Sequence, residues 1–185
     1  MAIFCSRRSS GRNKMEVFRH NGSLEITEID PFLAELLRQI PTSTSPESSP
    51  TAEERLFSRP ADPKEKELCA EWKLYVEPEL RRHFQSSTEV VTDDLRQLDQ
   101  NEKSFANATL RIPHEHADAW LNTLNQARLA IAAKFDFTEA ELSDHYHSPI
   151  GSRRDLSLFQ VNFYGFIQEF ILREMGCSAP PSPNE

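Results

Sequence analysis

The sequence predicts a mainly α protein, α+β at the margin, in which a helical bundle surrounds a central C-terminal helix and carries a small N-terminal β-hairpin. Three observations predict this fold class. Apolar residues recur at helical spacing through most of the second half of the chain. The segment 152–175 is apolar on two sides, as expected of a buried central helix. Near the N-terminus, two alternating runs flank Asn21-Gly22, which is the strongest short signal for a hairpin.

The N-terminal segment 1–14 differs in composition from the rest of the chain. It contains four basic residues, many serines and no acidic residue. This composition is typical of a disordered basic leader. An alternative explanation is that Met15 is the natural start and that the preceding residues are translated from an upstream codon. Both interpretations keep residues 1–14 out of the predicted core.

The next two segments are a compact part and a linker. Residues 15–40 are predicted to form the hairpin and a short helix of the core domain, with Asp30 as the N-cap and Pro31 in the first turn. Residues 41–66 are rich in Pro, Ser and Thr, which predicts a flexible linker between the two halves of the core. Leu56-Phe57 could form a small anchor within it.

Residues 67–176 are predicted to form the helical bundle, and 177–185, with three prolines, a disordered tail. Pro78 should break or kink the first helix of the bundle, because proline lacks an amide proton. The acidic surface of residues 89–102 is typical of a solvated helix face. Helices are expected from about 64 to 84, over 88–104, from Ile112-Pro113 to about 135, over 138–146 with a capping box at Thr138 and Glu141, and over 152–175.

Composition narrows the class of partners. The 185 residues have a formal net charge of -8, which argues against a general nucleic-acid binder because such a protein needs a basic face. There is no apolar run long enough to span a membrane and no secretory signal, so we expect a cytoplasmic protein without a membrane partner. Cys5, Cys69 and Cys177 are far apart and odd in number, which predicts reduced thiols.

Motifs for catalysis, cofactors or metals are weak or missing. The sequence has no nucleophile elbow and no glycine-rich phosphate loop, so we expect neither catalysis nor a cofactor. His114 and His116 should diverge at the start of a helix, whereas His145 and His147 could converge in a loop. Neither pair has supporting ligands at the usual spacing, and we expect no metal site. The helix start at residues 152–155 could hold an anion, although a solvated helix start is the simpler interpretation.

The clearest candidate site surrounds Arg128. This arginine lies in the middle of an apolar stripe, where a guanidinium must be paired, reach solvent or bind a ligand. Asn125 on the same helix, and Gln168 and Glu169 on the last helix, could complete a polar cluster. One interpretation is an ion pair between Arg128 and Glu169 that fixes how the two helices dock. The other is a pocket that recognises a small anionic ligand. The stripe consists of Ala117, Leu121, Leu124, Ile131 and Phe135.

The same two helices carry a family resemblance. The pattern Trp-Leu-x-x-Leu-Asn-x-Ala-Arg-Leu over 120–129 and the Ile-Gln-Glu over 167–169 resemble an uncharacterised bacterial family, domain of unknown function 2017. The resemblance covers roughly residues 15–175 and implies a short N-terminal β segment, a variable middle and these two helices. Relatives have small residues and glycine after the Arg-Leu pair, where this chain has Ala130-Ile131-Ala132-Ala133. The resemblance assigns no activity and implies at most a loose link to regulated proteolysis, through relatives encoded beside an adaptor of the Clp protease.

These observations together predict a cytosolic helical interaction or regulatory module without catalytic activity. We expect a protein partner or self-association. The alternative is a small anionic ligand or an enzymatic site around Arg128.

Overall fold

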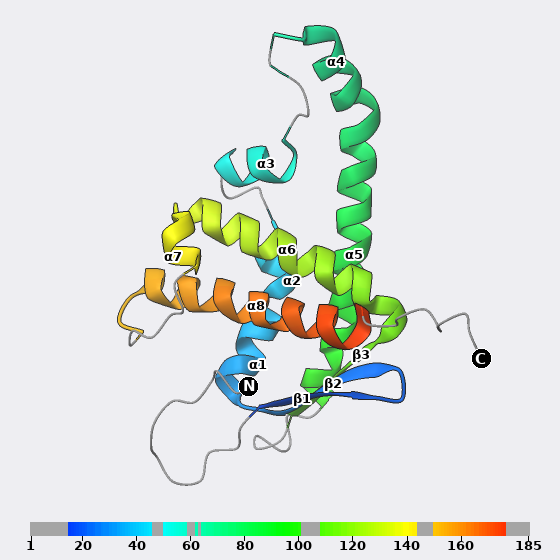
Figure 1. The fold of residues 1–185 in the computed structure, drawn as a ribbon, viewed down its shortest axis with the longest axis vertical. Coiled ribbons are helices and arrows are strands. Elements are labelled where there is room, and N and C mark those ends of the chain that lie inside the picture. The colour runs from blue at the N-terminus through cyan, green and yellow to red at the C-terminus, as the bar shows by residue number, and fades with distance from the viewer. Residues whose placement is uncertain are drawn as a thin grey trace, which may run out of the picture.

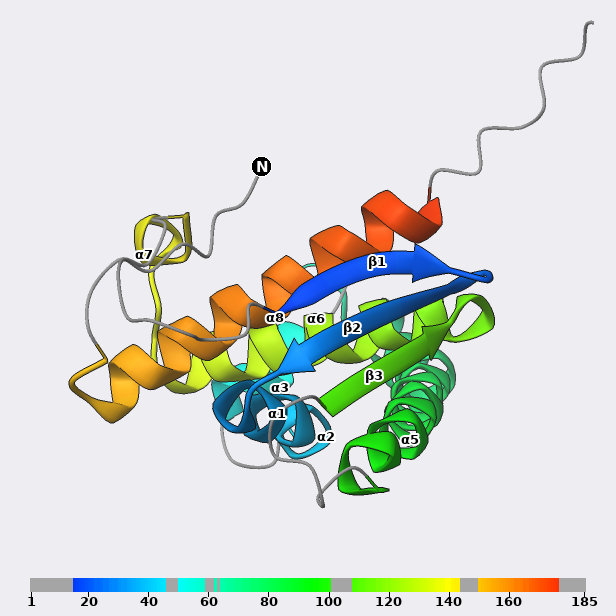
Figure 2. The same cartoon turned by 90° about the horizontal axis from the view of Figure 1, so that it is seen from below.

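The described part of the chain is mostly helical, with one three-stranded antiparallel sheet on one side of the helices (Figures 1 and 2). This confirms the predicted fold class. The predicted leader and tail lie outside the described residues, and none of the described helices is long and apolar enough to cross a lipid bilayer. The computed structural model describes residues 15–45, 50–58, 62, 64–100, 108–143 and 150–176.

The predicted hairpin is present. Strand β1 (Glu16–His20) pairs antiparallel with β2 (Ser23–Ile29). The turn residues Asn21 and Gly22 have φ values of 49° and 75°, the left-handed conformation that a two-residue hairpin turn requires. Leu24 in β2 is fully buried. The alternation along β2 therefore directs one face of the sheet into the core.

A third strand replaces the predicted start of the long helix. Strand β3 (Ala108–Pro113) pairs antiparallel with β2, with Ile112 opposite Leu24 and Leu110 opposite Ile26. The prediction that Ile112-Pro113 opens a helix is wrong, because Leu110 and Ile112 alternate into the core and Pro113 is the last residue of the strand. A short 3-10 turn, η3 (His114–His116), then leads into the helix.

Part of the predicted linker is helical. Helix α1 (Pro31–Arg38) begins as predicted, since the Asp30 side chain accepts a hydrogen bond of 2.9 Å from the Leu33 amide. Two short helices follow within the Pro-rich segment, α2 (Ile40–Ser43) and α3 (Pro50–Leu56). Ala52 and Leu56 of α3 are buried against Ala130 and Ala133. The small anchor predicted at Leu56-Phe57 thus reaches the core through Leu56, and Phe57 packs against the same cluster.

The first helix of the bundle is not broken at Pro78. Helix α4 (Lys66–Glu71), the π-helical turn η2 (Trp72–Val76) and α5 (Glu77–Gln100) form one continuous rod. The amide of Glu77 donates to the carbonyl of Trp72, five residues earlier, so the hydrogen bonding is offset just before Pro78. The helical rod therefore continues through Pro78 without a break. The helix predicted over 88–104 is its C-terminal part.

The two family helices pack side by side in antiparallel directions (Figures 1 and 2). Helix α6 (Ala117–Lys134) also contacts α2, α3 and α5, so it shares the central position predicted for the C-terminal helix, α8 (Arg153–Gly176). Their shared core is closed off from solvent. Its largest members are at most 1% exposed: Trp120 and Leu124 of α6, and Phe163, Tyr164 and Ile167 of α8.

The predicted capping box forms at α7 (Glu139–Ser143). The Glu141 carboxylate accepts hydrogen bonds of 2.9 Å from both the amide and the hydroxyl of Thr138, and one of 2.6 Å from Arg154. The Arg154 guanidinium, followed by the Thr138 donors, lowers the pKa of Glu141 from 4.5 to about 2. A depressed carboxyl pKa stabilises the folded state at pH values above the ordinary pKa of the carboxyl. This stabilisation is lost as the pH falls from 4.5 towards 2.

We therefore expect Arg154→Gln to raise the pKa of Glu141 towards its ordinary value, because the donor that stabilises the charged carboxylate most is removed. A carbon-detected NMR titration of the Glu141 carboxyl measures this shift. Arg153→Gln is the matched control, because Arg153 is equally exposed but makes no contact with Glu141 among the described residues. Equal pKa values in the two variants would contradict the assignment.

Candidate functional site

Arg128 lies between α6 and α8, where it is half-buried. Its Nη1 donates a hydrogen bond of 2.6 Å to Oε1 of Gln168. The other end of the same amide, Nε2 of Gln168, donates to the Leu121 carbonyl at 3.1 Å. Gln168 on α8 is thus held at two points of α6, seven residues apart along that helix. These hydrogen bonds fix the register of the two helices.

A glycine makes room for the guanidinium. A Cβ added at Gly165 of α8 would lie 3.3 Å from Cζ and from Nη2 of Arg128, so the guanidinium rests against the glycine backbone. Burial lowers the pKa of Arg128 below its ordinary value, although an arginine remains protonated at neutral pH. Its Nε is buried and has no hydrogen-bond partner within the described part of the chain. This atom is closed off from solvent.

The predicted polar cluster is assembled only in part. The structure brings Arg128 and Gln168 together, whereas Asn125 and Glu169 are exposed. The ion pair expected between Arg128 and Glu169 is not among the contacts of the described residues. Glu169 follows Gln168 directly, and one residue turns a helix by about 100°, which directs its side chain away from α6. The contacts support helix docking through a neutral amide.

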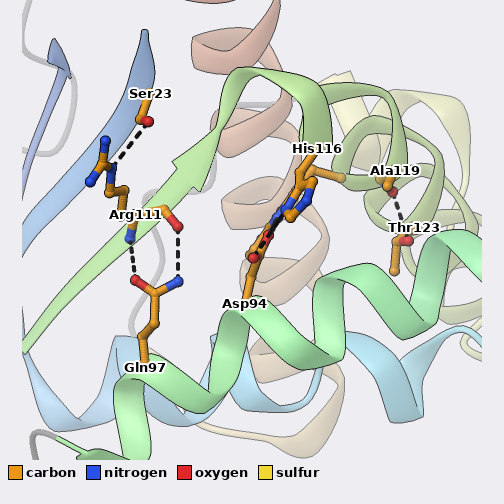
Figure 3. Close-up of polar contacts among 8 residues, drawn as sticks. Ser23, Asp94, Gln97, Arg111, His116, Ala119 and Thr123 are labelled. Carbon is orange, nitrogen blue, oxygen red and sulfur yellow. Dashed lines mark hydrogen bonds and ion pairs between the residues drawn. The ribbon is translucent and has the colours of Figure 1, made fainter. Parts of the chain in front are cut away.

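A second polar cluster joins α5 to the start of α6 (Figure 3). The carboxylate of Asp94 is 8% exposed and accepts a hydrogen bond of 2.8 Å from Nε1 of Trp120. Nδ1 of His116 lies 3.1 and 3.0 Å from the two oxygens of the same carboxylate. A carboxylate only accepts, so Nδ1 carries the proton. The sequence placed Asp94 on a solvated acidic face. The sequence signal for the burial of Asp94 was its position beside the apolar residues Val91, Leu95 and Leu98.

The Asp94–His116 pair resembles part of a catalytic triad but lacks the third member. Within the described residues, no serine, threonine or cysteine side chain is hydrogen-bonded to His116. A general base needs a proton donor within about 3 Å to activate a nucleophile. The pair instead supplies the acceptor that the buried Trp120 indole requires. We assign it a structural role.

Of the remaining candidates for metal binding, the structure describes only the pair His114 and His116, which does not converge. His114 is exposed, while His116 turns towards Asp94, so this pair diverges as predicted. His145 and His147 lie outside the described residues. Across the ranges that the structure covers, there is no group of three or more His, Cys, Asp or Glu side chains placed to hold a metal ion.

The edge of the sheet formed by β3 is covered by a side-chain amide (Figure 3). Gln97 of α5 donates to the carbonyl of Arg111 at 3.0 Å and accepts from its amide at 3.2 Å. The Arg111 guanidinium in turn donates to Ser23 on the neighbouring strand at 3.1 Å. These contacts occupy backbone groups that would otherwise be free to pair with another strand. The β3 edge is therefore a poor candidate for a docking surface.

Comparison with known proteins gives a family match. A family model described as a domain of unknown function, DUF2017, matches residues 19–175, which is most of the chain. The matched range includes α6 and nearly all of α8, the helices that carry the contacts of Trp120, Leu121, Arg128 and Gln168 described above. No curated protein and no solved structure matches this chain. The chain belongs to the DUF2017 family.

Proposed function

We propose that this protein is a non-catalytic interaction module that self-associates through a helical arm. The arm consists of residues 64–76, namely α4, the π-helical turn and the two residues before them. The observation that carries the proposal is a group of large apolar side chains on the arm. Leu68, Leu74, Tyr75 and Val76 are between 47% and 68% exposed. Clustered exposed apolar residues are typical of interaction sites.

The arm extends beyond the body of the molecule. Figure 1 shows α4 and the upper part of the rod projecting past α3 and α6. Lower in the rod, Phe84 packs against Phe57 with ring centroids 5.8 Å apart. Leu68, Trp72, Val76 and Leu80 precede Phe84 at four-residue intervals, so neighbouring members of this series lie next to each other on the helix surface. An apolar stripe that winds slowly around the rod therefore connects the arm with the residue that packs on the body.

The charge of the arm favours a second copy of the chain as the partner. The chain as a whole carries -8, so two copies repel each other over most of their surface. The arm contains three lysines and three glutamates and is neutral. Two arms can approach each other without net repulsion, and a lysine of one can pair with a glutamate of the other. An antiparallel pair of arms would bury the apolar stripe of both.

The test is sedimentation equilibrium of the full chain. We expect a reversible dimer for the native sequence and a monomer for the double variant Leu68→Glu, Val76→Glu, because two buried charges in each arm oppose pairing. Both positions are exposed, so the fold should be unaffected. Leu172→Glu is the matched control. This leucine of α8 is 57% exposed, lies outside the arm, and should leave the dimer intact.

A native chain that stays monomeric over the whole accessible concentration range would contradict the proposal. So would a dimer that survives the double variant, or that dissociates equally in the Leu172→Glu control. The absence of catalysis stays a prediction. The link to regulated proteolysis, which only the family resemblance implies, stays a prediction as well.

A further inference from the structure

A cavity of about 260 Å³ lies between the C-terminal half of α6, the segment 39–45 and the first two turns of α8. Its apolar wall includes Ile131 and Phe135 of α6. Its polar wall holds serine and threonine hydroxyls and two amides, with Lys134 and Arg153 at the rim. The volume is just below that of sites for drug-sized ligands, so it suits a small molecule or a single charged group.

The charges around this cavity have one sign. Among its described lining residues there are two cations and no aspartate or glutamate, in a chain that has 29 acidic and 21 basic residues. Lys134 and Arg153 are exposed and form no ion pair with a carboxylate of the described residues. A cleft that is lined by positive charges beside apolar walls concentrates the electric field and attracts anions.

One hydroxyl in the cavity lacks a hydrogen-bond partner among the residues that the structure describes. Ser157 is 7% exposed and lines the cavity, yet its side chain forms no hydrogen bond within the described part of the chain. Hydroxyls that are this well buried are ordinarily paired. Ser43, in the facing segment, already belongs to the hydrogen bonds around Gln160 and Tyr164. Its oxygen is 3.5 Å from Nε2 of Gln160, and its side chain is also hydrogen-bonded to the Tyr164 hydroxyl. One hydroxyl without a described partner, that of Ser157, and two cations thus border the same space.

The inner wall is held rigidly. Nε2 of Gln160 donates to the Tyr164 hydroxyl at 2.7 Å, and that hydroxyl donates to the Leu36 carbonyl at 2.7 Å. This chain of hydrogen bonds fixes α8 against α1 behind the cavity. Its rigidity reduces the entropy that a ligand must offset on binding.

The start of α8 does not itself form the site. The Asp155 amide donates to the Ser152 hydroxyl at 3.1 Å, and the Asp155 carboxylate accepts from the Gly151 amide at 3.2 Å. These contacts cap the helix internally. Arg154 is paired with Glu141. Of the two arginines at this helix start, Arg153 and Arg154, only Arg153 is available to a ligand.

We infer that this cavity binds the phosphate group of a small molecule, with Ser157 donating to its oxygens and Lys134 and Arg153 neutralising its charge. A phosphate offers more acceptor oxygens than a carboxylate and suits a site with hydroxyl and cationic donors. The inference is independent of the helical arm and of self-association.

The test is isothermal titration calorimetry of the full chain with inorganic phosphate and with glycerol 3-phosphate, at an ionic strength held constant with chloride. We expect saturable binding of one equivalent. Ser157→Ala should weaken it about five- to tenfold, because one hydrogen bond to a charged group is lost. Lys134→Gln should weaken it at least as much. Lys66→Gln, an exposed lysine of the arm, removes the same charge elsewhere and should leave the affinity unchanged.

Tighter binding of glycerol 3-phosphate than of inorganic phosphate would support an organic phosphate as the ligand, and the reverse order would support free phosphate. Absence of saturable binding by both probes would overturn the inference. So would equal affinities in the native chain and in both cavity variants, with thermal unfolding showing that each variant is folded.

Discussion

Replacing Asp94 with alanine is expected to destabilise the fold by about 2–4 kcal/mol, because it removes the acceptor for two donors at once. The Trp120 indole N–H would remain in a fully buried position without a partner, and Nδ1 of His116 would lose its acceptor. Equilibrium urea unfolding measures the loss. Asp94→Asn should cost less, since its amide oxygen can still accept from Trp120.

The neighbouring Asp93 provides the matched control for this substitution. Its side chain is 67% exposed and forms an ion pair with Arg96 at 3.0 Å, one turn along the same helix. Surface pairs of this kind contribute little, so Asp93→Ala should change the free energy of unfolding by less than about 0.5 kcal/mol. If the two alanine variants proved equally stable, the structural role assigned to Asp94 would be wrong.

Gly165→Leu is expected to destabilise the fold by about 1–3 kcal/mol, the usual range for overpacking. The added side chain must displace the Arg128 guanidinium, which lies 3.3 Å from the position of a Cβ. Its displacement also breaks the hydrogen bond to Gln168. The gain in helix propensity on replacing glycine, up to about 1 kcal/mol, offsets part of this cost.

The rescue experiment separates this steric effect from a general intolerance of α8. In an Arg128→Ala background the space beside Gly165 is empty, so Gly165→Leu should be neutral or stabilising. Urea unfolding of the two single variants and the double variant gives the coupling free energy. Additive losses would show that Arg128 and Gly165 do not compete for the same space.

Several features of the fold could be predicted because they depend on local chemistry. The Asn-Gly turn, the Asp30 cap and the capping box at Thr138 and Glu141 each need only a few consecutive residues. The candidate site was predictable in the same sense. An arginine in an apolar stripe signalled that Arg128 meets a polar partner across the interface, and the last helix supplied it.

Other features depend on contacts that local patterns do not encode. Strand β3 was concealed because Ile112-Pro113 also suits a helix start, and only pairing with β2 decides between the two. The partner of Arg128 was placed at Glu169 because charge complementarity suggested it, whereas the angular position on α8 selects Gln168. Asp94 looked like one acid among many on α5. Asp94 is buried because Trp120 and His116, from another part of the chain, pack against it.

The most direct test of the proposed function is hydrogen–deuterium exchange of the native chain at several protein concentrations. Amides in helices that lack tertiary packing exchange readily, and pairing two arms buries them. We expect the amides of residues 66–76 to become more protected as the concentration rises, while those of α6 and α8 stay unchanged. Exchange in the arm that is independent of concentration, or new protection elsewhere instead, would contradict self-association through the arm.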